Sequence, residues 1–572
     1  MVANFLGRRQ TNISSAAAII SLMIAFSRIL GLMRNRVLAH FFSSTELSLY
    51  FAAFRLPGAV FDILVFGVIS AAFIPTFTAY LAKDEEKQAW QIANGVLILA
   101  LLVFLVLSGL IFLLAAPLYR RIIPGFSQEQ IDQVVFLARI LIVSQGFFLL
   151  SYFLTGILES WQRFLVPAIA PIFYNLGIIG GTAFLAPKLG LTGSVLGVVA
   201  GAFFHFIIQL PLAFNLGFRP RLIFNFSQPG LKKVGRLAWP RIIELSLLEL
   251  AKTIELFFAS LVSVGAYTWL TFANSLQLLP VDLFGTSLAK ATLPTFSSLA
   301  AREENDQFKK VFLSSWQQIL FLTLPASVFL VVLRVPIVRL VFGAARFTWE
   351  STLETGYTLS VFCLAIFSQA LVLLLNRAFY AFQETKTAVK VSVFSTLINI
   401  ILSGLLILIL KFPLWGLALS FTLASLLQFL ILFRLLANKL GGFSKEETLT
   451  PFLKTALAAV VAGGLMFFLL KIFDRSVWDK RLSFLNFFGL RLSTSLEKFV
   501  LDTRYTTNLI LLTALVALAG AGAYLGLAWV LKIKALMVFL KTDYRLAGRN
   551  FFKEPDREII TATPKEGSEP LV

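Results

Sequence analysis

Three arginines lie inside apolar stretches that are long enough to cross a membrane. Arg28 and Arg34 belong to the first such stretch, and Arg55 belongs to the second. A charge at bilayer depth is costly unless it is paired or hydrated, and a guanidinium offers a fork of N–H donors that suits phosphate oxygens. These residues predict a water-filled cavity that holds an anionic head group, ideally a phosphate or pyrophosphate. The alternative is that one or more of them reach the bilayer surface along their apolar stems.

Helical spacing limits which of these side chains can act together. Ser27 and Arg34 are seven residues apart and share a helix face, whereas Arg28 is turned away from Arg34 by about 120°. A straight helix therefore cannot direct both arginines at one point. Ser27 joins the arginines as a candidate substrate-binding residue.

A later apolar stretch carries both acidic and basic residues. Glu249, Lys252 and Glu255 follow one another at intervals of three residues, so that they are close enough on a helix to neutralise one another. Arg241 and Glu244 precede them. One interpretation is an internally paired strip without a further role, and the other is a cation or proton site of the kind that couples transport to a gradient.

The composition requires a membrane environment for these charges. Hydrophobic residues make up 58% of the 572 residues, charged residues only 14%, and the mean hydropathy is +0.84. Too few polar side chains remain to cover a water-facing surface, and the alternation expected of a membrane barrel is absent. We predict an all-α polytopic membrane protein with about fourteen transmembrane helices of roughly 20 to 30 residues each.

The charge and the reactive side chains exclude several other functions. The formal charge of +20 comes from Lys and Arg spread over the loops, so we expect anionic membrane lipid and no nucleic acid as the partner. His40 and His205 have no neighbouring ligands for a metal, and Cys363 is the one cysteine. No catalytic constellation or nucleotide-binding motif is present, so we expect a protein that is not an enzyme.

An internal duplication organises the chain. Residues 74–77, Ile-Pro-Thr-Phe, are echoed by residues 293–296, Leu-Pro-Thr-Phe, and upstream Asp62 and Gly67 match Asp282 and Gly285. Such repeats usually enclose a transport site at their interface. We predict an N-lobe of six helices over 1–218, a C-lobe of six helices over 219–440, two further helices over 441–535 and a cytoplasmic tail over 536–572.

Loop charges and prolines add further expectations. Clusters of Lys and Arg occupy alternate loops, so the positive-inside rule places both termini in the cytoplasm. The connection between the last two helices, 474–506, is basic and aromatic, and we expect an amphipathic element on the outer interface. Prolines inside the helices predict kinks that serve as hinges or static packing features, at Pro57, Pro75, Pro280 and Pro294.

Several stretches resemble the MurJ/MviN lipid II flippases of the multidrug/oligosaccharidyl-lipid/polysaccharide exporter superfamily. They run in consistent order over about 13–438 and include Ser27-Arg28-Ile29-Leu30-Gly31-Leu32, Ala53-Phe54-Arg55-Leu56-Pro57, Ala72-Phe73-Ile74-Pro75, Leu283-Phe284-Gly285 and Pro336-Ile337-Val338-Arg339-Leu340. The resemblance implies two six-helix lobes and two extra helices that form a groove for a lipid tail. It also implies export of the polyprenyl-pyrophosphate-linked peptidoglycan precursor lipid II across the bacterial inner membrane by alternating access.

The chain departs from the family pattern at several cavity positions. Asn35 stands where the family has an acid after the second cation, and Asn274 stands where it has an acidic residue in the eighth helix. We include both asparagines among the candidate substrate-binding residues. Charges that the family pattern lacks are candidate cavity charges, with Lys290 as a neutralising partner of Asp282: Asp62, Asp282, Lys252 and Lys290.

The resemblance also suggests a coupling-ion site and three functional hypotheses. The family's acid in the seventh helix is matched by Glu255, with Asn399 and Ser420 as candidate partners for a sodium ion or proton. We expect no resident cofactor or metal, and we expect the protein to be a monomer. The leading hypothesis is a lipid II flippase; the alternatives are an exporter of another amphiphile or lipid-linked glycan, and a transport-dead scaffold for envelope assembly.

Overall fold

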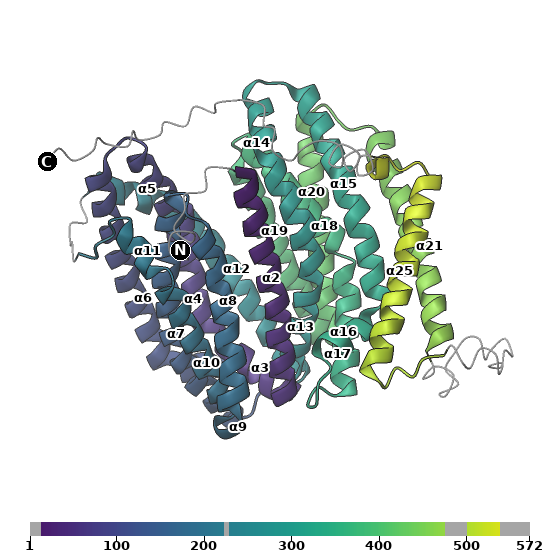
Figure 1. Ribbon diagram of the computed structural model, residues 1–572, viewed down its shortest axis with the longest axis horizontal. Coiled ribbons are helices and arrows are strands. Elements are labelled where there is room, and N and C mark those ends of the chain that lie inside the picture. The colour runs from purple at the N-terminus through teal and green to yellow at the C-terminus, as the bar shows by residue number, and fades with distance from the viewer. Residues whose placement is uncertain (1–12, 222–227, 475–499, 538–572) are drawn as a thin grey trace. The chain divides into compact units, whose positions relative to one another are not determined.

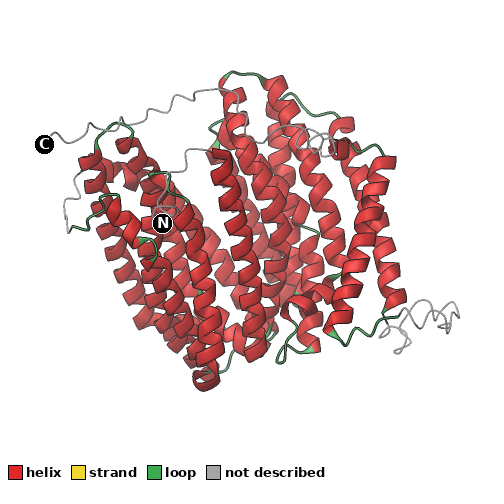
Figure 2. Ribbon diagram, in the orientation of Figure 1, coloured by secondary structure: helices red, strands yellow, loops and turns green. Residues whose placement is uncertain are grey.

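The computed structural model describes residues 13–221, 228–474 and 500–537. Within these ranges the chain forms helices and no strand, as Figure 2 shows. A membrane offers no water to unpaired backbone groups, and helices satisfy those groups within one segment. The predicted all-α class is therefore confirmed. The predicted amphipathic connection and the polar tail fall mostly outside the described residues.

Ten described helical stretches are long and apolar enough to cross a membrane, or eleven if the helices 349–363 and 366–381, which bend by 45° at their junction, form one span. These stretches make the chain a multi-pass membrane protein. The helix over 229–262 is 34 residues long but is not among them, since its five charged side chains between 241 and 255 reduce its hydropathy. The count of about fourteen stays a prediction.

The described chain divides into two compact units. The first contains 13–268 together with the short segment 344–347. Figure 1 shows its helices in purple and blue. In chain order they are α2 (Ile13–Phe41), α3 (Ser44–Ala53), α4 (Arg55–Leu64), η1 (Val65–Phe73), α5 (Ile74–Leu81), α6 (Glu86–Ile122), α7 (Gln128–Ser160), α8 (Leu165–Gly180), η2 (Gly181–Leu185), α9 (Ala186–Leu189), α10 (Leu191–Ile207), α11 (Leu210–Asn215) and α12 (Pro229–Val262).

The second unit contains 269–343 and 348–537 of the described residues. Its helices run from teal to yellow in Figure 1. They are α13 (Ala266–Pro280), η3 (Val281–Thr286), α14 (Ser287–Ala301), α15 (Asn305–Val332), α16 (Arg334–Phe342), α17 (Trp349–Cys363), α18 (Ile366–Ala381), α19 (Thr385–Gly404), η4 (Leu405–Ile409), α20 (Trp415–Lys439), α21 (Lys445–Phe473) and α25 (Thr506–Val530).

In the first unit α12 packs against η1, α4 and α6. The division into units therefore groups α12 with the helices that precede it, whereas the duplication pattern starts the C-lobe at residue 219. The predicted six-helix lobes and the segments 441–535 and 536–572 remain predictions.

Local sequence signals explain where several helices begin. Ser43, Ser127 and Ser444 each accept a hydrogen bond from the backbone of the third helical residue, whose side chain accepts one in return. Such capping boxes satisfy backbone donors that would otherwise be left free at a helix start. They fix the starts of α3, α7 and α21.

The duplication is visible as matching π-helical segments. The segment η1 contains Gly67, and η3 contains Gly285. A Cβ on Gly67 would lie 3.1 Å from Ile242 on α12, and a Cβ on Gly285 would lie 2.9 Å from the Cα of Ala370 on α18. The two glycines thus allow the same kind of close helix contact within each unit. A second matching pair, η2 and η4, follows α8 and α19.

The prolines mark boundaries more often than mid-helix kinks. Pro75 is the second residue of α5, immediately after η1, and Pro280 is the last residue of α13, immediately before η3. Pro57 lies in the first turn of α4, where a missing N–H is tolerated. Pro294 lies inside α14. Two of the four prolines therefore flank the π-helical segments, which often accompany functional regions.

Candidate functional site

Arg55, the first residue of α4, forms an ion pair with Glu249 of α12. Both side chains lie inside the first unit, with exposed fractions of 10% and 5%. A buried guanidinium needs such a partner, because its desolvation would otherwise oppose folding. The pairing places Arg55 inside the helix bundle and gives it an anionic partner within the chain itself.

Lys252 extends this pair into a chain of four charges. Its Nζ lies 2.6 Å from Oε1 of Glu249 and 3.6 Å from Oδ2 of Asp62. Asp62 is two helical turns after Arg55 on α4, and Lys252 is one turn after Glu249 on α12, so two charged stripes face each other. The predicted neutralisation of Glu249 by Lys252 is confirmed.

The order of charges in this group, Arg55, Glu249, Lys252, Asp62, alternates in sign, and the formal sum is zero. Arg55, a predicted substrate-binding residue, and Asp62, a predicted cavity charge, belong to one group because Glu249 and Lys252 of α12 lie between them. Lys252 is half exposed, with an exposed side-chain fraction of 51%, and is the most accessible of the four. An incoming anion would compete with Glu249 for Arg55 and with both carboxylates for Lys252.

Glu255 lies on the same helix and remains outside the ion-paired group. Within the described parts of the chain its carboxylate has no salt bridge to Lys252 or to another cation. The three-residue interval from Lys252 permits a contact that the structure does not make, because Lys252 turns toward Asp62 and Glu249. The salt bridges of this strip therefore include Glu249 and Lys252, whereas Glu255 makes none of them.

Arg34 has a different environment, composed of amides. Its Nε and Nη2 donate to Oδ1 of Asn35 at 3.1 and 3.0 Å, and its Nη1 donates to Oδ1 of Asn175 on α8 at 3.2 Å. The guanidinium carbon lies 6.0 Å from the ring centre of Tyr174. Among the residues that the structure describes, no carboxylate pairs with Arg34. Arg34 is thus oriented by neutral amide groups.

Asn175 connects this arginine to the backbone of α2. Its Nδ2 donates to the carbonyl oxygens of Pro171 at 3.1 Å and of Ser27 at 3.5 Å. Asn175 is buried, so its amide group is held in one orientation by these bonds. Ser27 therefore contributes through its backbone carbonyl to the group that positions Arg34.

Arg28 lies on another face of α2, as the predicted angle requires. Arg28 is exposed, and so are the apolar side chains of Phe26, Ile29 and Met33 beside it. The structure therefore does not bring Arg28 into the amide group around Arg34. The two arginines of α2 have separate surroundings.

In the second unit, Asn274 begins a ladder of side-chain amides. Gln277 donates through Nε2 to Oδ1 of Asn274 at 2.9 Å, and Gln369 on α18 donates through Nε2 to Oε1 of Gln277 at 2.9 Å. Gln277 is fully buried. A satisfied amide ladder fixes the relative register of α13 and α18.

This ladder ends at a cavity of about 320 Å³ within the second unit. Asp282 and Asn399 line the cavity together with Gln369. Lys290 does not neutralise Asp282 as expected from the sequence: it is exposed and forms no salt bridge among the described residues. Eight residues separate them, which turns the two side chains apart by about 80° on a regular helix, and Asp282 lies in the π-helical segment η3.

The candidate ion ligands have different surroundings. Asn399 lines the cavity, whereas the hydroxyl of Ser420 donates to the carbonyl of Leu417 at 2.8 Å and lies 2.7 Å from the hydroxyl of Ser403. Glu255 belongs to the first unit. Among the described residues no group of three or more His, Cys, Asp or Glu could hold a metal ion.

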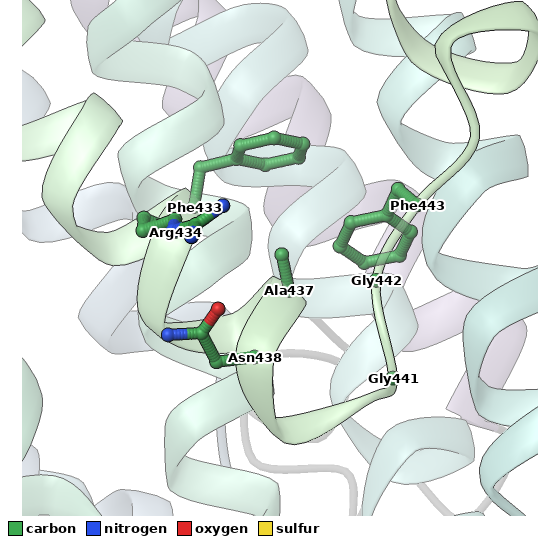
Figure 3. Close-up of a pocket in the computed structure, with 7 residues that line it drawn as sticks. All are labelled: Phe433, Arg434, Ala437, Asn438, Gly441, Gly442 and Phe443. Carbon is green, nitrogen blue, oxygen red and sulfur yellow. The ribbon is translucent and has the colours of Figure 1, made fainter.

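A second hollow, of about 450 Å³, lies at the carboxyl end of α20. Figure 3 shows that Phe433, Arg434, Ala437 and Asn438 come from α20, and that Gly441, Gly442 and Phe443 come from the loop after it. Arg434 is its only charged lining side chain among the described residues. The rings of Phe433 and Phe443 stack with centres 5.3 Å apart.

Comparison with known proteins identifies the family. The sequence profile described as lipid II flippase MurJ matches residues 37–489, which is most of the chain. The chain belongs to the MurJ family. A relative named probable lipid II flippase MurJ, from Buchnera aphidicola subsp. Acyrthosiphon pisum, is 29% identical over 471 residues, covering 80% of this chain and 90% of the relative. Another of that name, from Bdellovibrio bacteriovorus, is 28% identical over 442 residues, covering 76% of this chain and 83% of the relative.

Solved structures agree on the fold. A structure described as lipid II flippase MurJ in an inward closed conformation is similar with a TM-score of 0.72 at 22% identity, covering 93% of this chain and 100% of that one. An inward-facing multidrug resistance MATE family transporter is similar with a TM-score of 0.62 at 12% identity, covering 74% of this chain and 98% of that one. The MurJ-family chain thus has a transporter fold.

Sequence reasoning missed three side chains that organise these sites. Glu249 was considered only as part of a helix strip, although it is the partner of Arg55. Asn175 does not stand out as a single polar residue in an apolar stretch, although it orients Arg34. Gln369 gave no signal, because a glutamine in an apolar helix becomes informative only when its partner on another helix is known.

Proposed function

We propose that this MurJ-family chain moves lipid II, a polyprenyl-pyrophosphate-linked peptidoglycan precursor, across the bacterial inner membrane by alternating access. The observation that carries the proposal is the match of residues 37–489 to the lipid II flippase family. The multi-pass helical fold supports a membrane cargo. The chain acts as a transporter and not as an enzyme, as a monomer, with both termini in the cytoplasm.

Arg34 is the residue that supports recognition of the head group. Asn35 and Asn175, which are both neutral, hold its guanidinium in a defined orientation. A preoriented guanidinium binds phosphate oxygens at a smaller entropic cost than a free one. Arg55 acts later in the cycle, when the pyrophosphate replaces Glu249 as its partner. Arg28 and Asn274 contribute further contacts to the cargo.

A cation gradient drives the cycle in this proposal. Glu255 is the carboxylate on α12 without an ion-pair partner among the described side chains, so it is available to bind a sodium ion or proton. Asn399 and Ser420, in the second unit, are further candidates for cation binding, because alkali cations accept neutral oxygen ligands. Replacement of sodium by choline at constant pH separates sodium coupling from proton coupling.

The experiment that tests the proposed function is transport by the purified full-length chain in liposomes that contain lipid II. Lipid II that reaches the outer leaflet becomes accessible to an added modifying reagent. The proposal expects faster accessibility than in protein-free liposomes, and Arg34→Ala should remove most of that increase. A scaffold without transport would instead leave accessibility unchanged, and in cells depleted of this protein the variant with Arg28, Arg34 and Arg55 changed to alanine would restore growth as well as the wild type does.

A further inference from the structure

Arg55 and Lys252 contact the two oxygens of one carboxylate in the first unit. Arg55 pairs with Oε2 of Glu249, and Nζ of Lys252 lies 2.6 Å from Oε1 of the same side chain. The two cations are therefore spaced to contact neighbouring oxygens of one small anion. A diphosphate presents two anionic groups joined by a single oxygen atom, so each cation can contact a different phosphate.

Lys252 has donors available for a further acceptor. An ammonium group has three N–H donors, and among the described residues Lys252 makes one hydrogen bond, to Glu249 at 2.6 Å. Oδ2 of Asp62 lies 3.6 Å away, which is beyond hydrogen-bond distance, so this ion pair leaves the donors of Lys252 unused. The side chain is half exposed. Lys252 can thus donate to a phosphate while it keeps Glu249 as its partner.

Lys252 lies on the polar side of α12. Ile243 and Leu250 are exposed apolar residues that are seven positions apart, so they share the side of the helix that suits lipid. Lys252 and Glu255 are turned away from Leu250 by about 160° and 140° on a regular helix. The exposed ammonium group of Lys252 is therefore directed away from this apolar side, where a hydrated phosphate can reach it.

The neighbouring carboxylates keep Lys252 in place during an exchange of partners. When a phosphate replaces Glu249 at Arg55, the bond between Lys252 and Glu249 still neutralises that buried carboxylate, which would be costly to leave unpaired. Asp62 lies on α4, the helix that carries Arg55, and attracts Lys252 toward that helix. Asp62 thus holds Lys252 near Arg55.

We propose that Lys252 contacts one phosphate of the cargo while Arg55 contacts the other, so that Lys252 selects a diphosphate over a monophosphate. The inference rests on the proposed function and deepens it, because it names the residue that recognises the diphosphate link of the lipid. Asp62 acts as a positioning residue for Lys252.

Binding of two matched lipids by the full-length chain in lipid nanodiscs tests the inference. The probes are lipid II and a synthetic analogue in which a single phosphate joins the sugar to the polyprenol. We expect the wild type to bind lipid II about tenfold more tightly than the analogue. Lys252→Gln should bring the ratio of the two affinities close to one. The control Lys233→Gln, at an exposed lysine of the same helix, should keep the wild-type ratio.

A double variant tests the same inference should Lys252→Gln fail to fold. Asp62→Asn combined with Lys252→Gln removes one charge of each sign, so the formal charge of the group stays zero and the pair of Arg55 with Glu249 remains. The double variant should also bring the ratio close to one. Lys252→Arg keeps the positive charge and should retain the preference for lipid II.

A purely structural role of Lys252 as the partner of Glu249 gives a different pattern. Lys252→Gln would then lower the affinities for lipid II and for the analogue by the same factor, and their ratio would not change. That result, or equal affinity of the wild type for the two lipids, would overturn the inference while leaving the proposed function intact. Failure of the wild type to bind lipid II would contradict the proposed function itself.

Discussion

Arg55 on α4 and Glu249 on α12 are each other's ion-pair partners, and both side chains are almost entirely buried. Glu249 also binds Lys252 at 2.6 Å, so one carboxylate serves two cations. In this MurJ-family chain, Arg55, which we propose contacts the pyrophosphate, thus already has an anionic partner in Glu249. This pair links α4 and α12 within the first unit.

Breaking this pair should destabilise the first unit. Glu249→Ala leaves the guanidinium of Arg55 buried without its carboxylate, and we expect a loss of about 3–5 kcal/mol in the free energy of unfolding. Denaturant unfolding in detergent micelles measures this loss. The control is Arg241→Ala, which breaks the more exposed Arg241–Glu244 pair of the same helix and should cost about 0–1 kcal/mol. Equal losses in the two variants would show that burial of the Arg55 pair has no energetic consequence.

The amides around Arg34 should matter for cargo binding. Arg34→Lys keeps the charge but loses the planar fork that Asn35 and Asn175 hold, so the affinity for lipid II should fall about tenfold or more. Binding to nanodisc-embedded protein measures the change. Arg139→Lys is the control, because Arg139 is partly exposed on α7 and contacts Phe112 of its own unit. An unchanged affinity of Arg34→Lys would remove Arg34 from the binding site.

Packing of α8 on α10 provides a test of the fold. A Cβ on Gly177 would lie 2.4 Å from the Cα of Gly201, whereas a Cβ on Gly180 of the same helix would meet nothing within 4 Å. Gly177→Ala should therefore destabilise the protein by about 1–3 kcal/mol or more. Gly180→Ala should be neutral or stabilising by up to about 1 kcal/mol. A lower thermal midpoint for Gly180→Ala than for Gly177→Ala would contradict this packing.

Local features of the site were predictable from the sequence, and contacts between helices were not. The Glu249–Lys252 pair follows from a spacing of three residues on one helix, and the different surroundings of Arg28 and Arg34 follow from helical rotation. The partner of Arg55 could not be predicted, because Glu249 comes from a distant helix whose rotation is set by tertiary packing.

Two further differences have local physical reasons. Glu255 stays unpaired because Lys252 has nearer carboxylates on two sides, which a one-helix pattern cannot reveal. Lys290 does not reach Asp282 because eight residues separate them, which places them about 12 Å apart along a regular helix. The all-helical class and the family, in contrast, depend on hydropathy and on many short motifs together, and both are confirmed.

Transport of lipid II by the purified chain in liposomes tests the central claim most directly. The account predicts that the wild type makes lipid II accessible in the outer leaflet faster than protein-free liposomes do, that Arg34→Ala removes most of this activity, and that Arg139→Lys retains it. Wild-type accessibility no faster than in protein-free liposomes, or full activity in Arg34→Ala, would contradict it.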